Sequence, residues 1–241
     1  MGVSDGYVRL TAPEEIAAAR ALADAWKDPA IPDRQLAVSE PELARFRRGE
    51  VSPPFDAFCA AMDQTGLDWR GGERSRLIRV LEVGTSTGYY ADVMRHCGFG
   101  GYFLGADYSE PMILRAIQLR AADRNAFEVC DARRLRWPSR LFDVVVSGCC
   151  MLHMEDYREA LAEASRVSAA WVILHRNPIA AGPTEFWRKN AYDVPCLEIH
   201  FGRDDLLAAC AEAGLEVTFA HRISSAPDGS SNETWLASRV R

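Results

Sequence analysis

The chain has 241 residues, of which 48% are hydrophobic, and carries a net charge of −6 with a pI near 5.5. This length suits one α/β domain with a modest extension, and the acidic balance gives no overall attraction to a phosphate backbone, which argues against nucleic acid as partner. No apolar run approaches the ~18 residues that a membrane span needs and no secretory pattern is present, so we expect a cytoplasmic protein without a membrane partner.

The first part of the chain is predicted to be helical. Thr11 with Glu14, and Ser39 with Glu42, have the spacing of capping boxes and predict the starts of two helices. Apolar residues recur at helical intervals after each start, and a third helical pattern follows. We expect residues 1–70 to form a helical lid or cap on the main domain.

Beyond this extension, short apolar runs alternate with helical segments, which is the pattern of βαβ units around a parallel sheet. The last two runs are joined by a stretch too short for a crossover helix, so they should form an antiparallel hairpin. The expected fold is α/β: a Rossmann-like, doubly wound, seven-stranded, mostly parallel sheet with a C-terminal antiparallel hairpin and the N-terminal helical extension. The expected strands are residues 77–83, 102–106, 127–130, 143–147, 171–174, 215–220 and 234–238.

The turn after the first expected strand, from Glu82 to Gly88, is the most informative feature. Glycines let the backbone approach a ligand where a Cβ would collide, and α/β folds bind ligands at the carboxyl ends of their strands. Glu82 stands two residues before the first glycine, where a carboxylate would repel a pyrophosphate but can accept a hydrogen bond from an ammonium group. The turn therefore favours a cationic, phosphate-free cofactor, S-adenosyl-L-methionine.

Polar or small residues also end the next three expected strands. Asp107 is positioned to accept hydrogen bonds from two ribose hydroxyls, and Asp131 from an adenine amino group. The fourth strand ends in the small residues Ser147, Gly148 and Cys149, which would let the methionine part of the cofactor lie close to the backbone. Their order at successive strand ends favours one shared site.

These residues resemble the motif series of class I S-adenosylmethionine-dependent methyltransferases, a resemblance that covers the chain from about Leu77 onward. It implies a cofactor-binding methyltransferase domain over residues 71–241. One departure is Ser86, since the family usually has glycine there. The resemblance implies cofactor contacts by Glu82 near the amino-acid end, by Gly84, Ser86 and Gly88 in the turn, by Asp107 at the ribose, by Tyr108 and Met112 beside the adenine, by Asp131 and Ala132 at its edge, and by Ser147, Gly148 and Cys149 along the methionine part.

Two histidines are the candidate catalytic residues. Methylation of a hydroxyl benefits from a base that removes its proton, and histidine suits that role at neutral pH. His153 follows the fourth expected strand, near the methyl position, and His175 ends the fifth. The alternative is that both are structural histidines that tie loop backbone together.

A polar and aromatic insertion at about residues 178–203 follows the fifth strand. In the family that the chain resembles, insertions at this place commonly build the acceptor pocket, and with the N-terminal extension it would exclude water from the site. A plain packed helix would explain its aromatic residues equally well. The candidate substrate-binding residues are Arg176, Trp187, Tyr192 and Glu198.

The expected activity is S-adenosylmethionine-dependent methyl transfer to a hydroxyl or amino group of a polar small molecule, of sugar or natural-product type. One alternative is an NAD(P)-dependent oxidoreductase on a similar fold, although the turn lacks G-x-G-x-x-G. Another is a module that binds the cofactor without catalysis. The seven cysteines lack CxxC spacing, so we expect buried thiols and no metal site, and a homodimer is left open as the assembly.

Overall fold

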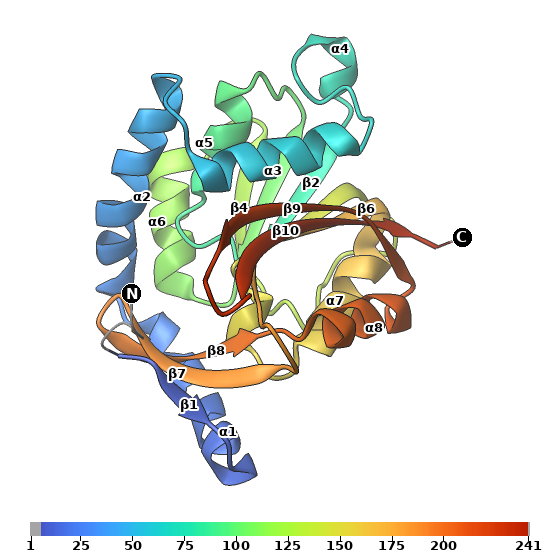
Figure 1. Cartoon of the computed structure of the whole chain (residues 1–241). Coiled ribbons are helices and arrows are strands. Elements are labelled where there is room, and N and C mark those ends of the chain that lie inside the picture. The colour runs from blue at the N-terminus through green and yellow to red at the C-terminus, as the bar shows by residue number, and fades with distance from the viewer. Residues whose placement is uncertain (1–5, 241) are drawn as a thin grey trace.

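The computed structural model describes residues 6–240, and a seven-stranded sheet runs through its centre (Figure 1). The strand order is β4-β3-β2-β5-β6-β10-β9, with the first five strands parallel and β10 antiparallel to both of its neighbours. This confirms the predicted fold class, hairpin included. The strands are β2 (Arg79–Val83), β3 (Tyr102–Asp107), β4 (Asn125–Val129), β5 (Phe142–Gly148), β6 (Ser168–Ile179), β9 (Leu215–Ser225) and β10 (Ser231–Arg239).

Helices cover both faces of this sheet, which is why its central strands are apolar on both sides. Val144 and Val146 of β5 pack in one cluster with α3, α5 and α6, whereas Val145 packs in the other with α7 and α8. Figure 1 shows α3 and α5 on the upper side and α7 and α8 on the lower side. These helices are α3 (Pro53–Gln64), α5 (Tyr89–His96), α6 (Glu110–Arg120), α7 (Tyr157–Val167) and α8 (Arg203–Glu212).

The N-terminal helices begin elsewhere than their capping patterns predicted. Glu15, not Glu14, accepts the amide hydrogens of Thr11 and Ala12, at 3.0 and 3.1 Å. Ser39 does not begin a helix but lies buried within one that begins eight residues earlier, at Ile31. Pro32 favours this earlier start, because its fixed φ suits the first turn of a helix. The elements here are α1 (Pro13–Arg20), the 3₁₀ helix η1 (Ala21–Lys27), α2 (Ile31–Arg47) and, after α3, the short α4 (Gly72–Ser75).

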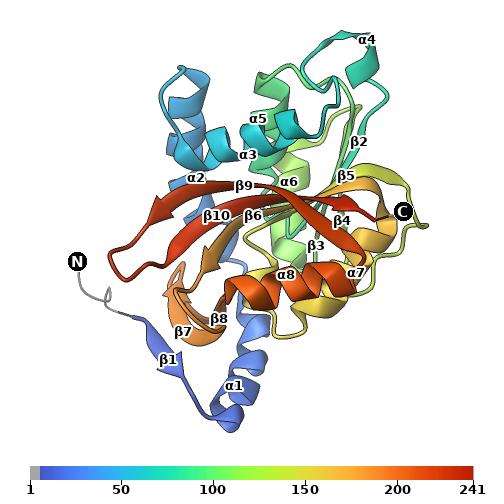
Figure 2. The ribbon, with the colours of Figure 1, turned by 45° about the vertical axis from the view of Figure 1, so that its right-hand side comes forward.

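The inserted segment after β6 forms a β-hairpin rather than a helix. Strands β7 (Glu185–Ala191) and β8 (Val194–His200) pair antiparallel, and β1 (Val8–Leu10) joins them in a second sheet (Figure 2). Its two-residue loop, Tyr192-Asp193, has positive φ at both positions (53° and 62°), as a type I′ turn requires. Such turns normally carry Asn-Gly, so Tyr192-Asp193 is no hairpin signal.

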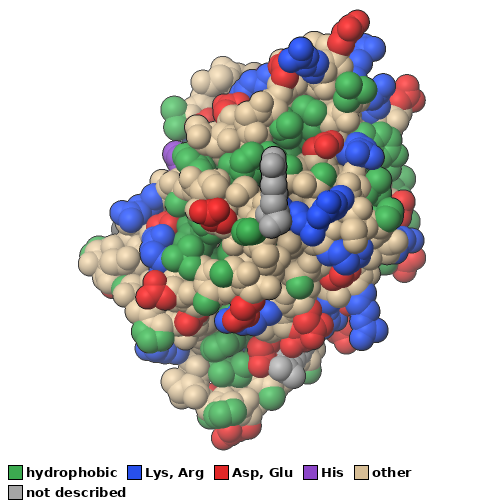
Figure 3. Space-filling model, turned by 90° about the vertical axis from the view of Figure 1, so that its right-hand side faces the viewer, with side chains coloured by type: hydrophobic (Ala, Val, Ile, Leu, Met, Phe, Trp, Pro, Cys, Tyr) green, Lys and Arg blue, Asp and Glu red, His purple; other side chains and the backbone are tan. Residues whose placement is uncertain are grey.

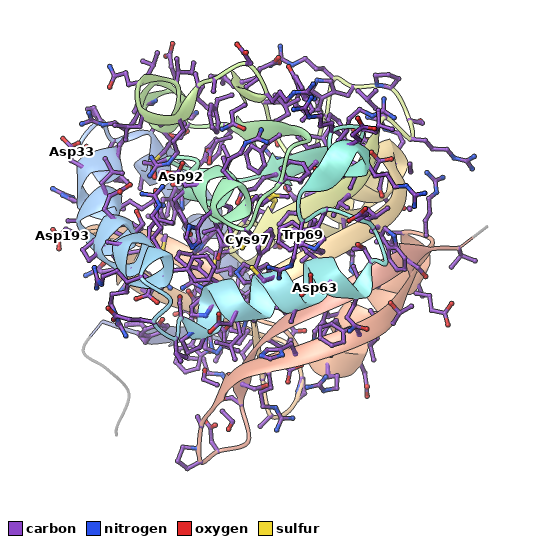
Figure 4. The ribbon with its side chains drawn as sticks, turned by 90° about the horizontal axis from the view of Figure 1, so that it is seen from above. Asp33, Asp63, Trp69, Asp92, Cys97 and Asp193 are labelled. Carbon is purple, nitrogen blue, oxygen red and sulfur yellow. The ribbon has the colours of Figure 1, made fainter. Side chains whose placement is uncertain are left out.

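Two arginines hold α2 in place. Arg34 donates to the backbone oxygen of Tyr192 at 2.7 Å and lies 3.8 Å from Asp193. Asp193 is labelled beside the blue helix in Figure 4. Arg120 is buried at the end of α6 and donates to Asp92 of α5 at 2.9 Å, to the backbone oxygen of Thr87 at 2.9 Å, and to Glu40 of α2. The N-terminal segment is thus bound both to the main domain and to the hairpin.

The surface carries charges of both signs. On the face in Figure 3, lysine and arginine side chains are interspersed with aspartate and glutamate, so no field of a single sign extends over it. None of the helices within residues 6–240 combines the length and the apolar character that crossing a bilayer requires.

The Arg120 contacts lead to a stability prediction. Arg120→Leu should lower the free energy of unfolding by about 3 kcal/mol, because it removes the buried guanidinium that joins α2, α5 and α6 and leaves the buried backbone oxygen of Thr87 without this donor. Arg115→Leu, which removes the exposed pair with Asp33, should cost at most about 1 kcal/mol. Urea denaturation followed by circular dichroism measures both, and equal losses would contradict a specific role for Arg120.

Candidate functional site

A cavity of about 490 Å³ opens at the carboxyl ends of β2 and β5. The strand order reverses between these strands, because β3 and β4 continue on one side and β6 on the other. Such a switch point is where open α/β sheets bind ligands. The walls come from the turn after β2, the ends of β3, β5 and β6, η1, and the β7–β8 hairpin.

Glu82 lies in the wall of this cavity at the end of β2. Its side chain is buried, and Thr85 donates its hydroxyl hydrogen to Oε2 at 2.6 Å. A Cβ added at Gly148 would lie 3.2 Å from Oε1, so the glycine leaves room for the carboxyl group. Burial raises the pKa of Glu82 to about 8, so the carboxyl group holds a proton at neutral pH unless a cation approaches it.

Asp107, at the end of β3, is the second buried acid in the cavity wall. Its two oxygens accept the backbone hydrogens of Ser86 and Ser109, each at 2.9 Å. Burial raises the pKa of Asp107 to about 6, although these two donors oppose the shift. The two amides fix the orientation of the carboxylate at the place where a diol can donate to it.

Strained backbone concentrates around the cavity. Ser86, Cys149, Arg176 and Tyr192 have positive φ of 53° to 61°, although none is glycine, and all four line the cavity. Such conformations cost free energy and cluster at functional sites. The value of 55° at Ser86 also explains why glycine suits this position in the family that the chain resembles.

The two glycines of the turn are needed for packing. Both have positive φ, 69° at Gly84 and 78° at Gly88. A Cβ at Gly84 would lie 2.4 Å from the Cβ of Cys150, and one at Gly88 would lie 2.5 Å from the ring of Phe127. Gly84 lines the cavity, but Gly88 does not, since it begins α5 behind the wall.

The residues predicted to contact adenine line the cavity, and three of them also contact other residues of the protein. Tyr108 donates its hydroxyl hydrogen to the backbone oxygen of Ala23 in η1. The Ser86 hydroxyl lies 3.3 Å from the sulfur of Met112. Asp131 accepts from the Arg133 guanidinium at 2.7 to 3.2 Å, so it is held beside the cavity by an ion pair.

The two candidate bases have different surroundings. His153, in the 3₁₀ turn η2 (Met151–His153), lines the cavity, and its Nδ1 donates to the backbone oxygen of Leu197 at 2.7 Å. Burial lowers the pKa of His153 to about 4. His175 does not line the cavity: Tyr90 binds its Nε2, and Thr234 lies 2.7 Å from its Nδ1. The structure therefore leaves no ring nitrogen of His175 for a substrate.

The structure also divides the predicted acceptor residues. Arg176 and Tyr192 line the cavity, but Trp187 and Glu198 do not. Glu198 instead pairs with Lys189 and accepts from the Tyr7 hydroxyl at 3.1 Å. Of the twelve predicted cofactor residues, Gly88 and Ser147 lie outside the lining and the remaining ten lie within it, namely Glu82, Gly84, Ser86, Asp107, Tyr108, Met112, Asp131, Ala132, Gly148 and Cys149.

Sequence reasoning missed several lining residues. Trp26 has the helical spacing of the apolar residues that follow Thr11, which predicts a packed helical face, yet η1 turns it into the cavity, where its ring centroid lies 4.8 Å from that of His153. Tyr89 directly follows the glycine turn, and that position was its only signal. Gln35 comes from α2 and accepts from the amide and the hydroxyl of Thr87, at 3.2 and 2.8 Å.

The sequence comparisons agree with this geometry. Residues 81–170 match the model of a methyltransferase domain. The chain is 35% identical over 131 residues to a demethylmenaquinone methyltransferase of Thermus thermophilus, and 33% identical over 144 residues to one of Deinococcus radiodurans. These matches cover 50% and 55% of this chain but only 58% and 59% of the two relatives, less than two thirds of their length.

Solved structures share the fold. A 1,6-didemethyltoxoflavin-N1-methyltransferase of Burkholderia thailandensis, solved with its substrate and S-adenosylhomocysteine, has a TM-score of 0.64 at 18% identity and covers 100% of this chain and 98% of its own. Magnesium protoporphyrin IX methyltransferase of Synechocystis, with S-adenosylmethionine bound, has a TM-score of 0.60 at 14% identity, covering 96% and 100%. The predicted resemblance to class I S-adenosylmethionine-dependent methyltransferases is confirmed.

The raised pKa of Glu82 leads to a second prediction. Ionisation in the unfolded chain begins near pH 4.5, whereas the folded carboxyl group ionises only near pH 8, so this group lowers stability as the pH rises through that window. The unfolding free energy of Glu82→Gln minus that of the wild type should therefore increase by roughly 2 to 4 kcal/mol when the pH is raised from about 5.5 to about 8.5. Urea denaturation at both pH values measures this gain. Glu73→Gln, on the exposed α4, is the control and should show no such change.

Proposed function

We propose that this chain transfers the methyl group of S-adenosylmethionine to a hydroxyl or amino group of a polar small molecule. The observation that carries the proposal is the gathering of Glu82, Asp107 and Gly148 around one cavity at the switch point of the sheet. This cavity lies within the methyltransferase domain, since residues 81–170 supply all three.

The donors and acceptors in the wall fit this cofactor. The Asp107 carboxylate, oriented by two amides, can accept from both ribose hydroxyls, and Glu82 can accept from the ammonium group. A dinucleotide fits less well, because its pyrophosphate would meet the buried Glu82. When bound, S-adenosylmethionine supplies an activated methyl group, and the protein supplies orientation and a dry site.

We propose His153 as the base for a hydroxyl acceptor. A backbone carbonyl only accepts hydrogen bonds, so the contact with Leu197 keeps the ring proton on Nδ1 and leaves the lone pair on Nε2. The lowered pKa keeps the ring neutral at physiological pH. Nε2 is therefore ready to take a proton from an acceptor in the cavity, and His175 is no longer proposed for this role.

The N-terminal segment and the hairpin are proposed to close the cavity over the acceptor. Tyr108 and Ser109 donate to backbone oxygens of Ala23 and Trp26, which ties η1 to the end of β3. The ring of Trp26 also contacts that of Tyr192 at 6.2 Å between centroids. This closure excludes water from the reacting groups.

The relatives support a small-molecule acceptor. The Burkholderia enzyme binds 1,6-didemethyltoxoflavin, and the Thermus and Deinococcus relatives are demethylmenaquinone methyltransferases by name. Their acceptors differ from one another, so they support a small molecule as acceptor but neither its polarity nor its identity.

A thermal-shift panel tests the cofactor. S-adenosylmethionine and S-adenosylhomocysteine should each raise the melting temperature, whereas NAD and NADP should not. A ligand that binds only the folded state stabilises it by about 2.7 kcal/mol at a concentration of a hundred times its dissociation constant. Asp107→Asn should lose most of this shift while its own folding is checked by circular dichroism. Selective stabilisation by NAD would overturn the proposed function.

Transfer of label from tritiated S-adenosylmethionine to small molecules of a cell extract tests the chemistry and supplies an acceptor for kinetics. With that acceptor, His153→Ala should lower kcat by about a hundredfold or more while the affinity for S-adenosylhomocysteine stays within about threefold. Because the pKa of His153 is about 4, the wild-type to variant ratio should not change between about pH 6 and 8. A module without catalysis would transfer no label, and turnover near that of the wild type would remove His153 as the base.

A further inference from the structure

Arg176 reaches the cavity through a distortion of β6. The pairing of β6 with β10 moves from Leu174 opposite Trp235 to Asn177 opposite Glu233, so two residues of β6 oppose Thr234 alone. A bulge of this kind re-aims side chains. At this bulge Arg176 adopts a φ of 61° and lines the cavity, whereas the preceding residue is buried in the core.

Among residues 6–240, the guanidinium of Arg176 has no carboxylate partner, unlike Lys189 and Arg133 in the same wall. Lys189 pairs with Glu198, and Arg133 pairs with Asp131 at 2.7 Å. A cation in a partly closed cavity is costly without an anion beside it, so the part of the wall around Arg176 is complementary to a negative charge.

The neighbours of Arg176 are neutral and mostly aromatic. The thiol of Cys149 and the phenol rings of Tyr89 and Tyr192 are the groups whose charge it would feel most, and burial raises the pKa of each of the three. Tyr89, Tyr192 and Trp26 all line the cavity. Arg176 therefore presents its positive charge beside flat aromatic surfaces, which suits a planar ligand.

We propose that Arg176 binds a negatively charged methyl acceptor, a small aromatic acid that is ionised at neutral pH. This inference rests on the proposed function and names the class of acceptor for that site. The planar guanidinium can donate two parallel hydrogen bonds to a carboxylate, which fixes the acceptor in the plane between the rings. Arg176 is then a substrate-binding residue that selects anions over neutral isosteres.

The competing assignment is that Arg176 binds the carboxylate of the cofactor's amino-acid part. The two assignments differ in what the arginine recognises, so they can be separated by measuring the two ligands independently. Loss of the charge should weaken the aromatic acid alone under our proposal, and S-adenosylhomocysteine under the competing one.

Isothermal titration calorimetry on the full chain tests this with matched probes. Salicylate is compared with salicylamide, and 1-hydroxy-2-naphthoate with 1-hydroxy-2-naphthamide, each in the presence of saturating S-adenosylhomocysteine. The wild type should bind at least one acid about ten- to a hundredfold more tightly than its amide. Arg176→Met should reduce this preference to about twofold or less, and Arg176→Lys, which keeps the charge, should retain an intermediate preference.

The control is Arg74→Met, which removes an exposed arginine of α4, at the opposite end of the molecule from β7 and β8 (Figure 1). It should keep the wild-type preference. A wild type that binds S-adenosylhomocysteine but favours neither acid overturns the proposal. So does an Arg176→Met variant whose affinity for S-adenosylhomocysteine falls about tenfold or more. A wild type that does not bind S-adenosylhomocysteine at all refutes the proposed function itself, so the two failures are distinguishable.

Discussion

The burial of two acids at neighbouring strand ends is the constraint on which this site depends. Glu82 and Asp107 are both nearly inaccessible to solvent, and hydroxyl or amide donors, not cations, hold them. Burying carboxyl groups in this way is unfavourable and raises the pKa of both. A ligand with an ammonium group and a diol supplies hydrogen-bond donors to these carboxyl groups. Binding such a ligand therefore offsets the free-energy cost of burying them.

The switch point of the sheet explains why these acids meet. Each comes at the carboxyl end of a parallel strand, and the strand order reverses between β2 and β5, where open α/β sheets have a crevice. Helix packing on both faces fixes the strands, and therefore the acids, with little freedom. The other side of the cavity is built differently: η1, η2 and the β7–β8 hairpin are short elements, and these vary readily between proteins of one fold.

The sequence predicted the part of the site that regular structure positions. Strands with apolar residues on both faces predict a parallel sheet. In such a sheet the residues at the carboxyl ends of the strands lie at one edge, so the order of the strands was enough to place Glu82, Asp107 and Gly148 together. Trp187 and Glu198 could not, because the Tyr192-Asp193 loop forms a type I′ turn without the usual residues and the hairpin then sets which side chains face the cavity. The bulge that separates Arg176 from His175 leaves no trace in composition or spacing.

The small sheet also bears on how the molecule is assembled. Leu10 pairs with Phe186, so β1 meets its partner only after most of the chain between them exists. Contacts over such a sequence separation close late, because the entropy of the long loop must first be offset by folding within it. On the ribosome, the central sheet up to β6 can begin to order before β7, the partner strand of β1, has been synthesised. The compartment that would receive the acceptor thus joins two segments, β1 and β7, that lie about 175 residues apart along the chain.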